Sequence, residues 1–91
     1  MLKIKKTTRF KTSLKKYQNN KAVMLELKKV LAHLENRELL PAKYKDHVLK
    51  GTLKNIRECH LKPDALLLYF VIENETLKLI DIGSHASVLK I

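Results

Sequence analysis

The chain reads Arg57-Glu58-Cys59-His60-Leu61-Lys62-Pro63-Asp64 and continues without a break as Ala65-Leu66-Leu67-Leu68-Tyr69-Phe70-Val71-Ile72. The second segment is apolar at odd and even positions alike, which predicts a central strand covered on both faces. Pro63 fixes φ and Asp64 can bond nearby backbone amides, so the junction of the two segments predicts a turn. The first segment places titratable groups at the end of a buried strand, where they lose hydration unless partners compensate. Such a set points to binding or chemistry.

Strand and turn signals continue on both sides of this pair. Residues 53–61 predict the strand before the turn, and Glu73-Asn74-Glu75 predicts a second hairpin turn. Residues 76–82 predict the next strand, which Gly83 ends, and residues 85–91 are expected to form a short tail. This part of the sequence therefore predicts an antiparallel β-meander.

The first half of the chain carries helical patterns after one short strand. Residues 2–5 alternate apolar and polar side chains, which predicts that strand. A first helix with a threonine N-cap is predicted over residues 7–17, and an amphipathic helix with outward lysines over residues 21–34. A proline excludes a helix through the connector, residues 36–45. We therefore expect an α+β fold in one domain, residues 1–91: a short N-terminal strand, an antiparallel helix pair and then the meander.

The net charge of the 91 residues is +10, and it is unevenly distributed. Residues 1–62 hold 17 Lys and Arg against 5 Asp and Glu, whereas residues 63–91 hold 2 against 4. This asymmetry suggests a surface that faces a polyanion, although a solvated, lysine-rich surface explains the charge equally well.

Cysteine use and hydropathy indicate the compartment. A single cysteine, Cys59, rules out an internal disulfide framework and fits a reducing environment. The basic start leads into polar residues, so no signal peptide is expected. The longest apolar run, residues 65–72, is far short of a membrane span. We expect a cytoplasmic protein with no membrane partner.

Alternation along a strand puts Glu58 and His60 on one face of the predicted meander. The turn brings Asp64 back toward them, His85 follows the end of the last strand, and His47 precedes the first. Three histidines could therefore meet at one sheet edge. Imidazoles titrate close to neutral pH, so two of them across a phosphate would supply an acid and a base.

Other kinds of site are disfavoured. For any single histidine a structural role is commoner, and His33 on the second helix is interpreted that way. His47, Cys59, His60 and His85 are suitable metal ligands, but the adjacent Cys59 and His60 point to opposite faces of a strand, and no paired-ligand spacing occurs. Cys59 is interpreted as a small core residue. Two glycines cannot form a Gly-rich phosphate loop, which excludes nucleotide-dependent enzymes. We expect no metal and no small-molecule cofactor.

Four blocks of this sequence resemble the YafQ branch of the RelE/ParE toxin superfamily in order and spacing. They cover about half the chain and are Tyr44-Lys45-Asp46-His47-Val48-Leu49-Lys50-Gly51, Arg57–Asp64, Leu68-Tyr69 and Gly83-Ser84-His85. The resemblance implies a RelE-like microbial RNase-type fold and a toxin of a type II toxin–antitoxin system. It also implies a ribosome-dependent endoribonuclease that cuts mRNA without a metal, by attack of a ribose 2′-hydroxyl on the adjacent phosphate.

Partners and site residues follow from the same resemblance. A cognate antitoxin would neutralise the toxin, and only the pair would bind operator DNA. The implied catalytic residues are His47, Glu58, His60, Asp64 and His85. Among them we expect His85 to be the general acid, with His60 or Asp64 assisting the base.

Charge and position suggest that Lys50, Lys54 and Arg57 contact phosphates of mRNA and ribosomal RNA. Three positions depart from the family pattern. Val48 replaces a common Pro, with little consequence expected. Asp81 stands where relatives carry Arg, and an acidic group there would repel a phosphate. Leu89 stands where relatives often carry Phe, so a base-stacking contribution of roughly 1–3 kcal/mol would be absent. Together, Asp81 and Leu89 raise the alternative of a weakened toxin.

Two non-catalytic functions stay open. A protein of the same fold could bind a target such as DNA gyrase, as ParE-type relatives do, or act only through the antitoxin and the operator. A basic nucleic-acid-binding domain would explain the charge. Neither function needs convergent histidines, so the histidine set favours the nuclease.

Overall fold

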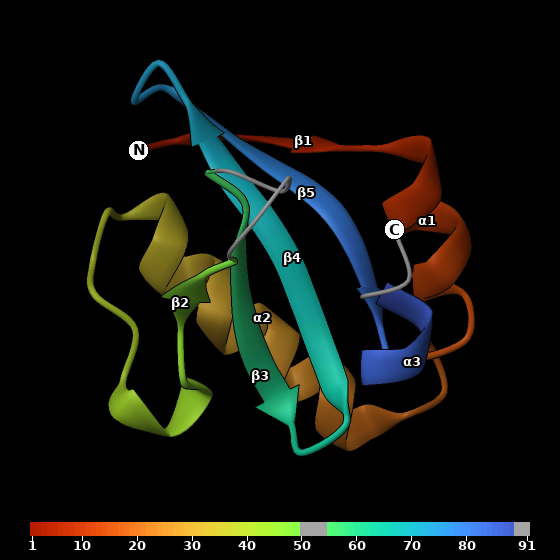
Figure 1. Ribbon diagram of the computed structural model, residues 1–91. Helices are drawn as coiled ribbons and strands as arrows, with labels where there is room; N and C mark the ends of the chain where they lie inside the picture. Colours follow the sequence, from red (N-terminus) through yellow and green to blue (C-terminus); the bar gives the residue numbers. More distant parts are fainter. Residues whose placement is uncertain (50–54, 89–91) are drawn as a thin grey trace.

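A computed structural model describes residues 1–49 and 55–88, and its elements follow the predicted order (Figure 1). The elements of the first half are β1 (Lys3–Lys6), α1 (Thr8–Leu14), α2 (Lys21–Glu35) and a 3-10 helix, η1 (Ala42–Tyr44). The remaining elements are β2 (His47–Val48), β3 (Arg57–Lys62), β4 (Ala65–Ile72), β5 (Thr76–Gly83) and α3 (His85–Val88).

The structure corrects the predictions at four places. The first helix, predicted over residues 7–17, ends at Leu14, because the N–H groups of Lys16 and Tyr17 bond three residues back, in turns. The strand before the turn begins at Arg57 and not at residue 53, because Asn55 has a φ of 69° that a strand does not accommodate; residues 53 and 54 lie outside the described part. His47 and Val48 form the short strand β2 in what was expected to be an approach segment. The predicted tail begins with the helical turn α3.

The sheet has five strands in the order β1-β5-β4-β3-β2. β1 pairs with β5 in parallel, and the other neighbours pair antiparallel, as the predicted meander requires. α2 crosses one face of the sheet and packs against β3, whereas α1 packs against β5 near the edge (Figure 1). None of the helices within residues 1–49 and 55–88 has the length and apolar character that crossing a membrane requires.

Both faces of β4 are covered, which confirms the interpretation of its continuous apolar run. One cluster lies between the sheet and the helices and includes Leu67, Tyr69 and Phe10. A smaller cluster on the opposite face joins Leu66 and Leu68 to Val88 of α3. Because α3 covers this second face, the four-residue helix is part of the core.

The approach of α3 to the sheet depends on Gly83. A Cβ at this position would overlap the Oγ of Ser87 and lie 3.0 Å from Cγ1 of Val88. The carbonyl of Ser84 accepts hydrogen bonds from Ser87 and Val88, which closes the helical turn directly after the strand. This turn fixes the position of His85.

A bulge in β5 brings Asp81 out of the main core. Tyr69 pairs with Leu79 and Leu68 pairs with Asp81, so Ile80 is the extra residue. Leu79 before the bulge and Ile82 after it both belong to the main core cluster, which leaves Asp81 on the other side. Its carboxylate is nevertheless buried, at 3% exposure of the residue.

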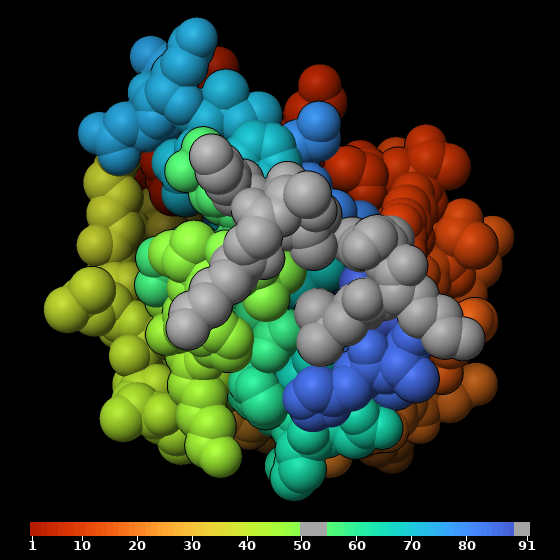
Figure 2. Space-filling model, in the orientation of Figure 1, coloured from red at the N-terminus to blue at the C-terminus, as the bar shows by residue number. Residues whose placement is uncertain are grey.

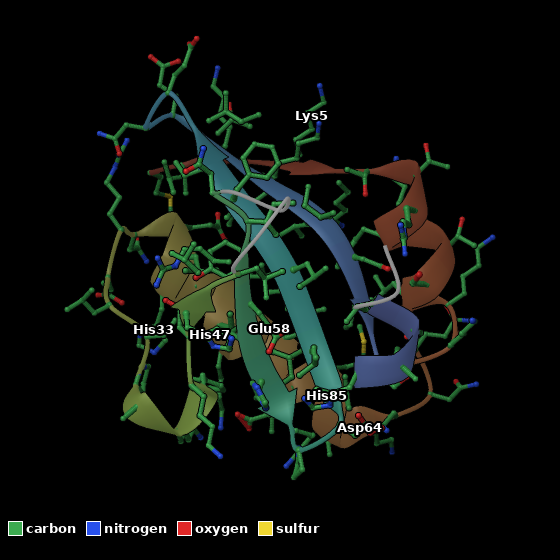
Figure 3. All side chains as sticks on the ribbon, in the orientation of Figure 1. Lys5, His33, His47, Glu58, Asp64 and His85 are labelled. Atoms are coloured by element: carbon green, nitrogen blue, oxygen red, sulfur yellow. The ribbon has the colours of Figure 1, made fainter. Side chains whose placement is uncertain are left out.

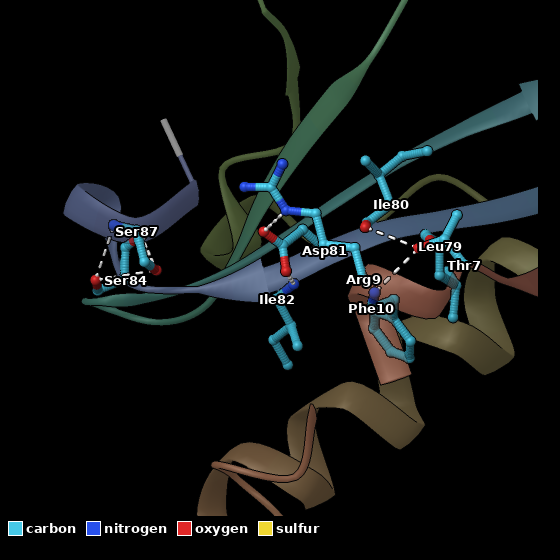
Figure 4. A network of polar contacts seen from close by, with 9 residues as sticks. All are labelled: Thr7, Arg9, Phe10, Leu79, Ile80, Asp81, Ile82, Ser84 and Ser87. Carbon is cyan, nitrogen blue, oxygen red and sulfur yellow. Dashed lines mark hydrogen bonds and ion pairs between the residues drawn. The ribbon is translucent and has the colours of Figure 1, made fainter. Parts of the chain in front are cut away.

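The buried carboxylate of Asp81 is compensated by helix α1 (Figure 4). Nε of Arg9 donates to Oδ2 of Asp81 at 2.9 Å, and the backbone N–H of Ile82 donates to Oδ1 at 2.8 Å. Thr7 caps the same helix: its Oγ1 accepts from Phe10 N–H at 3.0 Å. The helix cap and the ion pair together fasten α1 to β5.

We expect substitutions of Arg9 and Asp81 to lower the free energy of unfolding by different amounts. Arg9→Met leaves a buried carboxylate without its cation and should lower the free energy of unfolding by about 1–3 kcal/mol. Asp81→Asn should cost less, because the amide oxygen can still accept from Ile82 and the half-exposed Arg9 can turn to water. Urea unfolding at pH 7 of both single variants and the double variant measures the coupling.

Arg37→Met is the control, since Arg37 donates to Asn74 at an exposed position and its loss should cost less than about 0.5 kcal/mol. Equal losses for the two single variants, adding up in the double variant, would contradict the assignment.

Candidate active site

The predicted convergence of the histidines is present in the structure. His47 on β2, His60 on β3 and His85 of α3 meet near the β3–β4 turn. Ring centroids are 6.4 Å apart for His47 and His60 and 5.4 Å for His60 and His85. His47, Glu58 and His85 lie on the same side of the sheet (Figure 3). On the molecular surface, the β3–β4 turn and α3 are neighbours (Figure 2).

Glu58 is the buried centre of this group, at 4% exposure. Its Oε1 lies 3.3 Å from Nε2 of His60 and 3.5 Å from Nε2 of His47. Its Oε2 is buried without a hydrogen-bond partner among the described residues. Burial of a carboxylate is costly unless opposite charge or donors compensate, and the imidazoles of His47 and His60 are placed to do so.

Asp64 orients His85. One oxygen, Oδ1, accepts from the backbone N–H of His85 at 3.0 Å and contacts Nδ1 of the ring at 2.8 Å. These hydrogen bonds lower the pKa of Asp64. An ionised carboxylate can only accept, so Nδ1 carries a proton and Nε2 is the ring atom that remains to exchange a proton with a substrate.

The ring of His47 is held from the connector. Its Nδ1 lies 2.7 Å from the carbonyl oxygen of Lys45, which can only accept, so Nδ1 is the donor. Lys45 has a left-handed φ of 49° after η1, and this turn aims its carbonyl at the ring. Nε2 of His47 is thereby directed to Glu58.

Asp46 anchors β2 on the meander, a contact that the sequence analysis missed. Its carboxylate accepts from Nε and Nη2 of Arg57, at 3.2 and 2.7 Å, and from the hydroxyl of Tyr69. Burial, and then this hydrogen bond, raise the pKa of Tyr69. Arg57, expected to contact RNA, is therefore engaged in holding β2 beside β3. The family-like blocks contain Asp46, Arg57 and Tyr69, so the sequence did offer a signal for this contact.

Other residues singled out from the sequence lie either outside the described residues or away from this site. Lys50, Lys54 and Leu89 lie outside the described residues. Cys59 is fully buried in the main core, where desolvation raises the pKa of its thiol to about 12, as expected of a structural cysteine. His33 pairs with Glu38 at the surface, 2.9 Å away, and takes no part in the site.

The sequence analysis considered His47, Cys59, His60 and His85 as metal ligands but left out Glu58. Glu58, His60 and His85 each offer an atom, and these three atoms lie within 4.8 Å of one another. Two imidazoles and a carboxylate suit divalent transition metals. The shared parity of Glu58 and His60 on one strand was the usable signal.

Two imidazoles in this site could each exchange a proton with the same substrate phosphate. His60 and His85 present imidazoles from different elements, and each ring is paired with its own carboxylate, Glu58 and Asp64 respectively. Such paired groups suit acid–base catalysis on a phosphodiester.

Comparisons with known proteins show the family of this chain. Residues 2–90 match the family described as "Bacterial toxin of type II toxin-antitoxin system, YafQ". The chain is 39% identical to the mRNA interferase toxin YafQ of Escherichia coli K12 over 66 residues, 71% of each protein.

Two solved structures extend the comparison over the whole fold. A copper-bound mutant toxin from Helicobacter pylori has a TM-score of 0.89 and 38% identity, covering 97% of this chain and 99% of that one. The DinJ–YafQ complex of E. coli has a TM-score of 0.84 and 31% identity, covering 97% and 98%. This chain therefore belongs to the YafQ family, the bacterial toxins of type II toxin–antitoxin systems.

Proposed function

We propose that this chain is a ribosome-dependent endoribonuclease that cleaves mRNA in the cytoplasm and is neutralised by a cognate antitoxin. The observation that carries the proposal is the meeting of His60 and His85, 5.4 Å apart between ring centroids, beside the buried Glu58. Relatives named mRNA interferase and a relative solved with the antitoxin DinJ support it.

The reaction that fits these residues is a transesterification, in which the phosphoryl group moves from the 5′-oxygen to the neighbouring ribose 2′-oxygen. His60 takes the proton of the ribose 2′-hydroxyl while the 2′-oxygen forms a bond to phosphorus. His85 gives a proton from Nε2 to the departing 5′-oxygen as its bond to phosphorus breaks. The products are a 2′,3′-cyclic phosphate and a 5′-hydroxyl end, and no water, metal or redox partner is consumed.

Glu58, Asp64 and His47 support these two proton transfers. The carboxylate of Glu58 favours the imidazolium that His60 becomes, and Asp64 holds the tautomer of His85. His47 adds a third imidazole beside these groups, 6.4 Å from His60 between ring centroids. The carboxylate of Asp81, expected to repel a phosphate, is paired with Arg9, which supports an active toxin over a weakened one.

His60→Ala and His85→Ala should each reduce mRNA cleavage by about 100-fold or more, because each removes one proton transfer. The measurement is induction of the toxin without antitoxin, followed by mapping of new mRNA 5′ ends and of growth. His33→Ala, which changes a histidine outside the site, should cleave like the wild type.

Growth arrest by both variants at the wild-type level, with no new 5′ ends in any strain, would contradict the nuclease and favour a non-catalytic target-binding toxin. Binding to operator DNA without arrest would favour a regulatory role.

We also propose that Glu58, His60 and His85 bind a divalent transition-metal ion such as Cu²⁺. The unpartnered Oε2 of Glu58 supports this, as does the copper-bound relative. An ion on these side chains would prevent both imidazoles from transferring protons.

Cleavage should accordingly be inhibited by Cu²⁺ and be unchanged in EDTA. Calorimetric titration of the isolated protein with CuCl₂ should show one site that His60→Ala and Glu58→Gln each weaken, whereas His33→Ala retains it. Loss of cleavage in EDTA, or equal copper binding by all variants, would refute this proposal.

A further inference from the structure

A hollow of about 400 Å³ opens beside the catalytic residues, between η1 and the end of β3. His60 lines this hollow and also belongs to the catalytic group, so the two adjoin at this residue. Leu61 and Pro63 supply apolar wall, and lysines from both sides of the hollow supply charge. Its volume falls within the range of about 300–1,000 Å³ that is common for pockets that hold small organic groups.

The charge of the hollow is positive. Glu26 is the one acidic group among the described residues that line it. Its carboxylate accepts from Tyr44 at 2.6 Å and lies 3.4 Å from Nζ of Lys43 and 3.7 Å from Nζ of Lys29. These contacts, the tyrosine first, lower the pKa of Glu26. Glu26 is thus neutralised by its own partners.

Two further lysines line the hollow and differ from Lys43. Neither Lys45 nor Lys62 is in an ion pair with a described residue. Both are exposed. Their charge is therefore available to a ligand.

The same contacts that place the catalytic histidines place these two lysines. The carbonyl of Lys45 accepts from the ring of His47 at 2.7 Å. Lys62 follows His60 by two residues, across the irregularity in the β3–β4 register. An RNA strand that presents a phosphate to His60 would therefore pass these lysines.

We propose that the hollow binds the nucleotide next to the cleaved phosphate, with Lys45 and Lys62 contacting that nucleotide's own phosphate. Leu61 and Pro63 contact its ribose or base. This inference rests on the proposed function for the identity of the ligand as RNA. It assigns RNA contacts to residues other than the expected Lys50, Lys54 and Arg57.

The test uses a fluorescent RNA tetranucleotide with 2′-O-methyl groups, which cannot be cleaved because it has no 2′-hydroxyl. Its anisotropy is titrated with wild-type protein, with the variant Lys45→Gln/Lys62→Gln and with a matched control, Lys15→Gln/Lys28→Gln. The control removes the same charge from exposed lysines around the hollows between α1 and α2. Thermal unfolding shows that all three proteins are folded.

The Lys45→Gln/Lys62→Gln variant should bind about tenfold more weakly, and its log–log salt slope should be shallower by about 0.7 for each lost phosphate contact. The control should stay within about twofold of the wild type. Equal weakening of both variants would show that only net charge matters, and it would overturn the inference. Wild-type affinity in the first variant, or no binding by any protein, would overturn it as well.

Cleavage is measured separately, so that the two proposals can fail separately. Binding that depends on Lys45 and Lys62 in a protein that cleaves no mRNA would refute the nuclease and leave an RNA-binding hollow. Cleavage by the wild type with unchanged binding and cleavage in the Lys45→Gln/Lys62→Gln variant would refute the hollow alone.

Discussion

A carboxylate with almost no access to water, that of Glu58, governs the polar end of this protein. Moving an ionised carboxylate out of water costs several kcal/mol unless nearby groups replace its hydration. His60, two residues along the same strand, and His47, from the neighbouring strand, lie within 3.3 and 3.5 Å of it. β2 must stay on β3 for this compensation to exist, and the contact of Arg57 with Asp46 provides that attachment.

The parts of the fold and site that could be predicted are those with a repeated local signal. Continuous apolar residues at 65–72 indicated a strand covered on both faces, and β4 is the central strand. Alternation separated Cys59, now in the core, from Glu58 and His60 in the site. The family-like blocks then indicated that His85 belongs with them.

The parts that could not be predicted depend on contacts between distant residues. β2 has two residues and α3 has four, too few for any periodicity, and both exist because other elements hold them. Asp81 was expected to repel a phosphate because relatives carry Arg at this position, yet its partner Arg9 lies 72 positions away on a helix. The bulge at Ile80 that exposes Asp81 to Arg9 has no local sequence signature.

The parallel pairing of β1 with β5 has a consequence for biosynthesis. Lys3 lies beside Thr76, so β1 finds its partner only after a long intervening stretch has been translated. Contacts between such distant segments form late and slowly. A nascent chain that has not reached β5 also lacks His85. Under the proposed function, the active site would therefore be incomplete while residues 76–85 are still being made.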